Sequence, residues 1–179
     1  IDAICQQEGV GAEQADLIRS WSVSGDQFQA AIGQPGTGKT FTMRAARKIW
    51  ESHGYRVLGA AVKGTAAQHL GRETGIASET VAHYLTAAAM GVEQLDARTI
   101  LVVDEATTLS DRDLHALMHL CRRTGATLRM IGDPAQQQSV TAGGMWEHMI
   151  NCYQSRTPEL RLQRRLDRLP LNRGLGGTG

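Results

Sequence analysis

The chain has 179 residues, a formal net charge of +1, 41% hydrophobic residues and 21% charged residues. This length allows one α/β domain with a short appendage and is too short for two full ATPase domains. The composition excludes wholesale disorder, and no apolar run approaches the roughly 18 residues that a membrane span needs.

The first residue is Ile1, not Met, so we expect a piece of a longer chain. No segment resembles a signal peptide. The three cysteines are scattered along the chain, which predicts a reduced, cytoplasmic protein with neither a disulfide framework nor a zinc ribbon.

The predicted elements alternate between helices and strands. In chain order we expect a helix at 12–20, a strand at 28–32, a helix at 40–53, a strand at 55–62, helices at 65–72 and 81–90, a strand at 99–103, a helix at 111–124, a strand at 127–131 and a short helix at 145–150. Thr80 and Ser110 are the expected N-caps of the two helices that follow them. This alternation is typical of βαβ units and predicts an α/β fold with a mostly parallel sheet flanked by helices.

The pattern degrades towards the end of the chain. Residues 151–179 carry a charge of +4, whereas the preceding residues sum to −3. We therefore expect a globular domain over residues 1–160 and a basic, glycine-rich, flexible tail over residues 161–179. Residues 161–168 could form a basic helix, and a phosphate-tracking patch and a solvated surface are equally good interpretations of its arginines.

A glycine-rich segment joins the first predicted strand to the next helix. It fits the pattern G-x-x-x-x-G-K-[ST] with Gly33, Gln34, Pro35, Gly36, Thr37, Gly38, Lys39 and Thr40. Glycines let main-chain N–H groups surround phosphate oxygens, and the positive end of the following helix faces the same anion. Lys39 can reach the β- and γ-phosphates, and the Thr40 hydroxyl can bind Mg²⁺. Phe41 completes the predicted nucleotide-binding segment.

Two acidic residues follow the most strand-like segment. Asp104 and Glu105 come directly after the strand at 99–103, which we expect to neighbour the strand before the glycine-rich segment. In that position Asp104 would face the Mg²⁺, and Glu105 could deprotonate the water that attacks the γ-phosphate. Acids of this kind are otherwise common as helix caps.

A third polar element follows the strand at 127–131. It runs from Gly132 through Asp133 and Pro134 to Gln136. A neutral amide at Gln136 can hydrogen-bond a γ-phosphate oxygen or the attacking water, although the Asp-Pro pair alone equally indicates a turn.

The combination of GQPGTGKT, VVDEA and GDPAQ resembles the first RecA-like motor domain of superfamily 1 DNA helicases. More narrowly, it is similar to the helicase part of conjugative relaxase–helicases of the TraA/TraI kind and to RecD-like helicases. The resemblance implies a P-loop NTPase that binds ATP with Mg²⁺ and acts on single-stranded DNA. It makes Gln14 the residue that grips the adenine edge.

The same resemblance implies further contacts. It places DNA-contacting residues at Lys63, Gly64, Thr65 and Thr80, and an arginine that senses the γ-phosphate near the end of the domain, at Arg165 or its neighbour Arg164. It also implies a second RecA-like domain, absent from this chain, whose arginine completes the catalytic cleft. Because such an arginine is worth roughly 10³–10⁵ in rate, we expect slow hydrolysis by this chain alone.

Two other functions remain open. The chain could be a P-loop ATPase that is not a motor, or a truncated fragment that binds nucleotide without helicase activity. DNA-stimulated hydrolysis distinguishes the motor from both.

Overall fold

The computed structural model describes residues 1–92, 94–133, 135, 150 and 159–160. The described elements are α1 (Asp2–Gln7), α2 (Ala12–Val23), β1 (Phe28–Gly33), α3 (Lys39–Ser52), β2 (Arg56–Ala61), α4 (Gly64–Thr74), β3 (Ala77–Thr80), α5 (Val81–Ala89), β4 (Thr99–Val103), the 3₁₀ turn η1 (Ala106–Thr108), α6 (Asp111–Thr124), β5 (Thr127–Gly132) and β6 (Glu159–Leu160).

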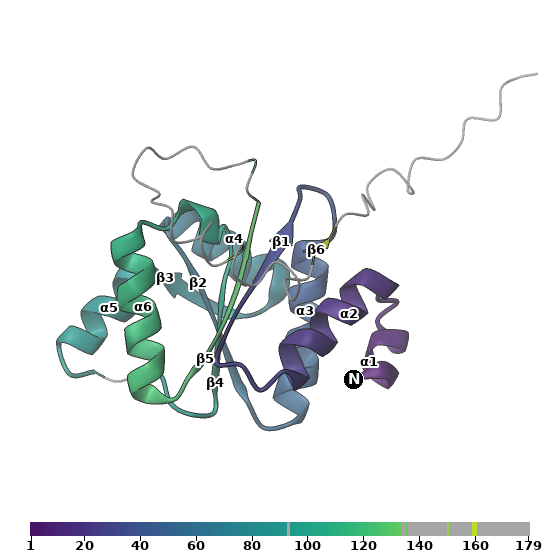
Figure 1. Cartoon of the computed structure of the whole chain (residues 1–179), viewed down its shortest axis with the longest axis horizontal. Helices are drawn as coiled ribbons and strands as arrows, with labels where there is room; N and C mark the ends of the chain where they lie inside the picture. Colours follow the sequence, from purple (N-terminus) through teal and green to yellow (C-terminus); the bar gives the residue numbers. More distant parts are fainter. Residues whose placement is uncertain (93, 134, 136–149, 151–158, 161–179) are drawn as a thin grey trace, which may run out of the picture.

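The strands form one sheet in the order β3-β2-β4-β5-β1-β6, and every neighbouring pair is parallel. Helices cover both faces of this twisted sheet, with α5 and α6 on one side and α1, α2 and α3 on the other (Figure 1). The predicted α/β fold with a mostly parallel sheet flanked by helices is confirmed.

Strand β4 lies in the centre of the domain, and all five of its residues are buried. Its side chains alternate between the two faces, as strand geometry requires. Ile100 and Val102 pack in the cluster that includes residues of α1, α2 and α3, whereas Leu101 and Val103 pack in the cluster that includes residues of α5 and α6. A strand buried on both faces is continuously apolar, and this explains why the segment was so clear in the sequence.

Most predicted elements lie within a few residues of the observed ones. Both predicted caps form, since the hydroxyls of Thr80 and Ser110 accept hydrogen bonds from the main-chain N–H groups of His83 and Asp113, each at 3.1 Å. The predicted helix at 145–150 lies outside the described residues except for Ile150, and the segment 161–179 lies outside them entirely.

Four elements were not predicted: α1, β3, η1 and β6. The sequence of β3 is Ala-Ser-Glu-Thr, and its residues are alternately exposed and half-buried. It lies at the edge of the sheet, where few apolar side chains are needed, so the usual hydrophobic signal of a strand is missing.

One expectation about the sheet is wrong. The strand that precedes Asp104 does not neighbour the strand that precedes the glycine-rich segment, because β5 lies between β4 and β1. Ile32 of β1 pairs with Gly132 of β5, and Val103 of β4 pairs with Met130 on the other side of β5. The order of the strands along the chain differs from their order in the sheet, because β5, which comes later in the chain, lies between β1 and β4.

Within the described part of the chain, every helix is too short or too polar to cross a bilayer.

Candidate nucleotide-binding site

The glycine-rich segment forms a loop between the carboxyl end of β1 and the start of α3. Gly36 and Gly38 have φ values of +82° and +83°, a left-handed conformation that is costly for residues with a Cβ. Gly38 is the N-cap of α3 and supplies no side-chain cap. The positive end of α3 therefore faces the loop uncapped, and this is the arrangement that binds phosphate in P-loop proteins.

Lys39 is the first residue of α3, and its side chain passes directly over Gly33. A Cβ added at Gly33 would lie 2.7 Å from Lys39 Cδ, 2.8 Å from Lys39 Cγ and 3.0 Å from Ile131 Cδ1. The missing side chain of Gly33 is therefore what admits the lysine into the loop. Lys39 forms no ion pair with any described residue, so its charge remains available to an anion.

Thr37 and Gln14 hold the loop from behind. Thr37 is 1% exposed, and its hydroxyl donates to the Gln34 carbonyl at 2.8 Å. Gln14, in the first turn of α2, donates from Nε2 to the Thr37 carbonyl at 2.9 Å, while its Oε1 accepts from the Gly11 N–H at 3.2 Å. Gln14 is only 3% exposed, so both ends of its amide are engaged inside the protein.

The remaining residues of the segment lie around the loop. Gln34 and Pro35 are exposed, whereas Thr40 and Phe41 are half-buried in the first turn of α3. The Arg44 guanidinium carbon lies 5.3 Å from the centre of the Phe41 ring, within the range of a cation–π contact.

Asp104 and Glu105 lie at the same edge of the sheet as the loop, because all the strands are parallel and both segments follow a carboxyl end. The inserted strand β5 separates the axes of β1 and β4 by two strand spacings, about 10 Å. Such a gap leaves room for phosphate groups and a metal ion between the loop and the acids. Asp104 is half-buried and Glu105 is exposed.

Mg²⁺ fits the donors at this edge. Among the described residues, no group of three or more His, Cys, Asp or Glu side chains could hold a metal ion by itself. Mg²⁺ is usually bound through one or two carboxylates together with substrate phosphates and water. Thr40 and Asp104 suit that mode, because each supplies a single hard oxygen beside the loop where phosphate would lie.

Asp133 also lies at this edge, although no site role was predicted for it. It follows β5, directly between the loop and Asp104, and is only 3% exposed. Its Oδ1 accepts a hydrogen bond from the Ala135 N–H at 3.0 Å. The signal was present, since Asp133 is an acid directly after a buried strand. Gln136 itself lies outside the described residues, as do Arg164 and Arg165.

The residues expected to contact DNA gather at the neighbouring part of the same edge. Lys63 is the exposed N-cap of α4, directly after β2, and α4 has no side-chain cap there. Gly64 and Thr65 form its exposed first turn. Thr80 ends β3 and pairs in register with Ala61 of β2, so it lies beside the start of α4.

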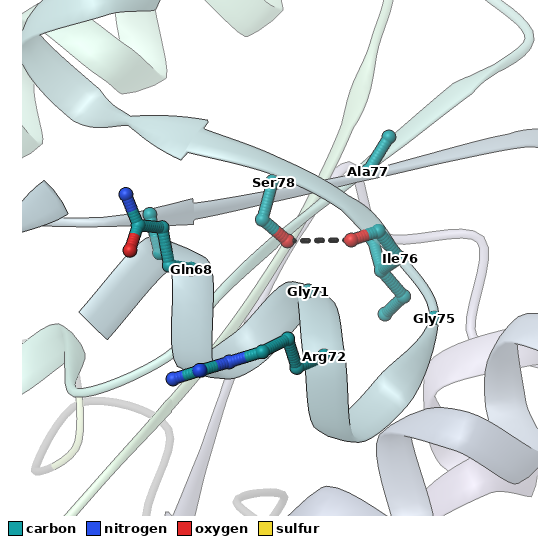
Figure 2. A pocket seen from close by; sticks show the side chains of 8 residues that line it. Gln68, Gly71, Arg72, Gly75, Ile76, Ala77 and Ser78 are labelled. Carbon is teal, nitrogen blue, oxygen red and sulfur yellow. Dashed lines mark hydrogen bonds between the residues drawn. The ribbon is translucent and has the colours of Figure 1, made fainter. Parts of the chain in front are cut away.

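A pocket of about 560 Å³ lies elsewhere, between α4 and the edge strand β3. Figure 2 shows the Ser78 hydroxyl donating to the Ile76 carbonyl beside Gly71 and Arg72. None of the predicted site residues lines this pocket. The glycine-rich loop and the two acids thus remain the candidate site.

Comparison with known proteins shows the family to which the chain belongs. The family model described as an AAA domain matches residues 9–173, which extends into the segment expected to be a tail. The probable conjugal transfer protein TraA of Sinorhizobium fredii is 43% identical over 118 residues, covering 66% of this chain and 11% of that protein. The ATP-dependent RecD2 DNA helicase of Deinococcus radiodurans is 30% identical over 141 residues, covering 76% of this chain and 19% of that protein.

The fold also has a solved counterpart. The crystal structure of a Bacteroides Pif1 in complex with ADP-AlF4 superposes with a TM-score of 0.57 at 16% sequence identity, covering 87% of this chain and 43% of that one. At this identity the likeness concerns the fold alone. The chain spans between about a tenth and a fifth of the curated relatives described above. The chain belongs to the AAA domain family, as a helicase-type RecA-like domain related to the TraA conjugal transfer proteins and RecD2.

Proposed function

We propose that this chain is the ATP-binding and ATP-hydrolysing motor domain of a DNA helicase, and part of a longer protein of the TraA or RecD2 kind. The observation that carries the proposal is the pairing of two features at one sheet edge. Lys39 lies over Gly33 in the glycine-rich loop, and Asp104 and Glu105 follow β4 across the gap made by β5.

The residues divide the work by their chemistry. The loop N–H groups and Lys39 bind the β- and γ-phosphates, and Thr40 and Asp104 hold Mg²⁺. When bound, the metal ion neutralises charge that develops on the phosphate oxygens. Glu105 is exposed at the same edge, and it orients the attacking water and accepts its proton. Gln136, three residues after Asp133 in the sequence, contacts the γ-phosphate or the water.

Gln14 contributes to nucleotide binding through the loop. Its amide joins Gly11 to Thr37 and is only 3% exposed, so contact with an adenine edge would have to use the second Nε2–H or the second lone pair of Oε1. The relative affinities for ATP and GTP distinguish these two roles.

The proposed binding site for single-stranded DNA lies at the same edge of the sheet. Single-stranded DNA would lie across the start of α4, where Lys63, Gly64 and Thr65 offer a cation and uncapped N–H groups to a backbone phosphate, with Thr80 alongside. A second RecA-like domain, in the part of the longer protein not present here, would supply the catalytic arginine. The free, buried thiols of Cys5 and Cys121 support a reducing, cytoplasmic setting.

Steady-state ATP hydrolysis, measured with and without single-stranded DNA, tests the proposal. We expect slow turnover that DNA stimulates, loss of ATP binding in Lys39→Ala, and unchanged ATP affinity with most turnover lost in Glu105→Gln. Turnover indifferent to DNA would instead indicate a non-motor ATPase. Tight nucleotide binding without turnover would indicate a passive fragment.

Equal loss of ATP affinity and turnover in Glu105→Gln would contradict the role of Glu105 as a general base. In that case the carboxylate would be a binding group.

A further inference from the structure

Glu105 has a backbone conformation that no other described non-glycine residue shares. Its φ and ψ are +52° and +37°, in the left-handed region. L-residues enter this region at a cost, and such strain persists only where the surroundings impose it. The contacts that impose this conformation act on the proposed general base.

The hydrogen bonds around Glu105 identify them. On its amino side, the Glu105 N–H donates to Asp104 Oδ1 at 2.9 Å. On its carboxyl side, the Glu105 carbonyl accepts two hydrogen bonds from a single residue. The main-chain N–H of Thr108 donates at 2.8 Å, and the Thr108 hydroxyl donates at 2.8 Å.

A carbonyl oxygen has two lone pairs, and Thr108 occupies both. The main-chain bond alone would be made by any residue other than proline at position 108. The second bond requires a side-chain hydroxyl, and it restricts the direction of the Glu105 carbonyl further. The hydroxyl therefore adds a second restraint on the carbonyl of the residue that has the left-handed conformation.

Burial holds the 3₁₀ turn that carries Thr108 in place. Ala106 is 0% exposed, Thr107 is 2% exposed and Leu109 is 4% exposed, so the 3₁₀ turn that carries Thr108 is fixed in the core. The Glu105 side chain, by contrast, is exposed. The backbone is therefore what aims the carboxylate.

We propose that Thr108 is a positioning residue for the hydrolytic reaction. Its hydroxyl holds Glu105 in the left-handed conformation that directs the carboxylate towards the attacking water. This inference rests on the proposed function, because it assigns Thr108 a role through Glu105. The role assigned to Thr108 is thus indirect, through the Glu105 carbonyl.

The test uses the 179-residue chain and two matched substitutions. Thr108→Val keeps the branched shape and the main-chain N–H and removes the hydroxyl, whereas Thr108→Ser keeps the hydroxyl. Because a small misplacement of a catalytic group is expensive, we expect Thr108→Val to lower kcat about tenfold or more with KM for ATP unchanged. Thr108→Ser should remain within about twofold of the wild type, since one hydroxyl replaces another.

A double substitution separates positioning from general destabilisation. In a Glu105→Gln background, Thr108→Val should have no further effect on turnover, because the group that it positions is already gone. A further decrease there, or wild-type kcat in Thr108→Val alone, would overturn the inference while leaving the proposed function intact.

A structural measurement decides the inference even if the wild type fails to hydrolyse ATP, an outcome that would refute the proposed function. NMR couplings report the φ angle of Glu105 directly. The inference is supported if φ of Glu105 is positive in the wild type and in Thr108→Ser but not in Thr108→Val. A positive φ retained in Thr108→Val refutes it.

Discussion

Substituting Gly33 by alanine tests the central geometric feature of the site. The added Cβ would lie 2.7 Å from Lys39 Cδ and 2.8 Å from Lys39 Cγ, distances at which one of the two groups must move. The strand backbone at Gly33 is paired with β6, and that of the preceding Ile32 with both β5 and β6, whereas the lysine side chain is half-buried and can rotate. We therefore expect Lys39 to move away from the loop.

The size of the effect follows from what the lysine contributes. A hydrogen bond that involves a charged group contributes about 1.5–3 kcal/mol, so its loss should weaken ATP binding by roughly 10- to 150-fold. The fold should lose little, about 1 kcal/mol, because the crowding is relieved by one flexible side chain. Isothermal titration with Mg·ATP gives the affinity, and urea unfolding gives the stability.

Gly91→Ala is the matched control. Gly91 has a φ of +75° and open space around the position of a Cβ, and it follows α5, away from the site. We expect it to cost about 1–2 kcal/mol of stability because of the left-handed backbone, with no change in ATP affinity. Wild-type ATP affinity in Gly33→Ala would refute the reasoning, because Lys39 would then not depend on the space above Gly33.

Three further predictions follow from individual contacts. Gln14→Leu removes both hydrogen bonds of the amide and should weaken ATP and GTP binding by the same factor; a loss confined to ATP would mean that Gln14 reads the base. Lys63→Ala should weaken binding of single-stranded DNA and reduce the slope of log K against log salt concentration by about 1, whereas an unchanged slope would remove Lys63 from the interface. Burial raises the pKa of Tyr84 to about 12, and its hydroxyl donates to the Gly59 carbonyl at 3.1 Å. Since the folded state holds this proton more tightly than the unfolded state, stability should fall as pH rises from about 10 towards 12, and Tyr84→Phe should reduce that fall. An identical pH profile in Tyr84→Phe would exclude Tyr84 as its source.

The sequence predicts an element well where the structure of that element depends on residues close together in the chain. The strand Thr99–Val103 was predicted with its observed bounds because all five residues are buried, which demands a continuous apolar run. Thr80 and Ser110 were recognised as caps because a hydroxyl before a helix satisfies N–H groups within the next turn. The glycine-rich loop was visible for the same reason, since its conformation depends on residues adjacent in the chain.

Other features depend on residues far apart in sequence, and only the tertiary structure decided them. The position of β5 between β1 and β4 comes from competition among strands, which no local pattern encodes. The burial of Gln14 against Thr37 joins residues 23 positions apart, so a polar residue on a helix could not be recognised as a support of the loop.

The sequence alone thus determined where the glycine-rich loop lies and which acids end a buried strand, because glycine conformation and apolar burial act over a few residues. The tertiary structure decided how far apart those groups lie and what holds them there. Strand order, the passage of Lys39 over Gly33 and the burial of Gln14 against Thr37 all arise from contacts between elements. Packing depends on the whole fold, and a local pattern carries no record of it.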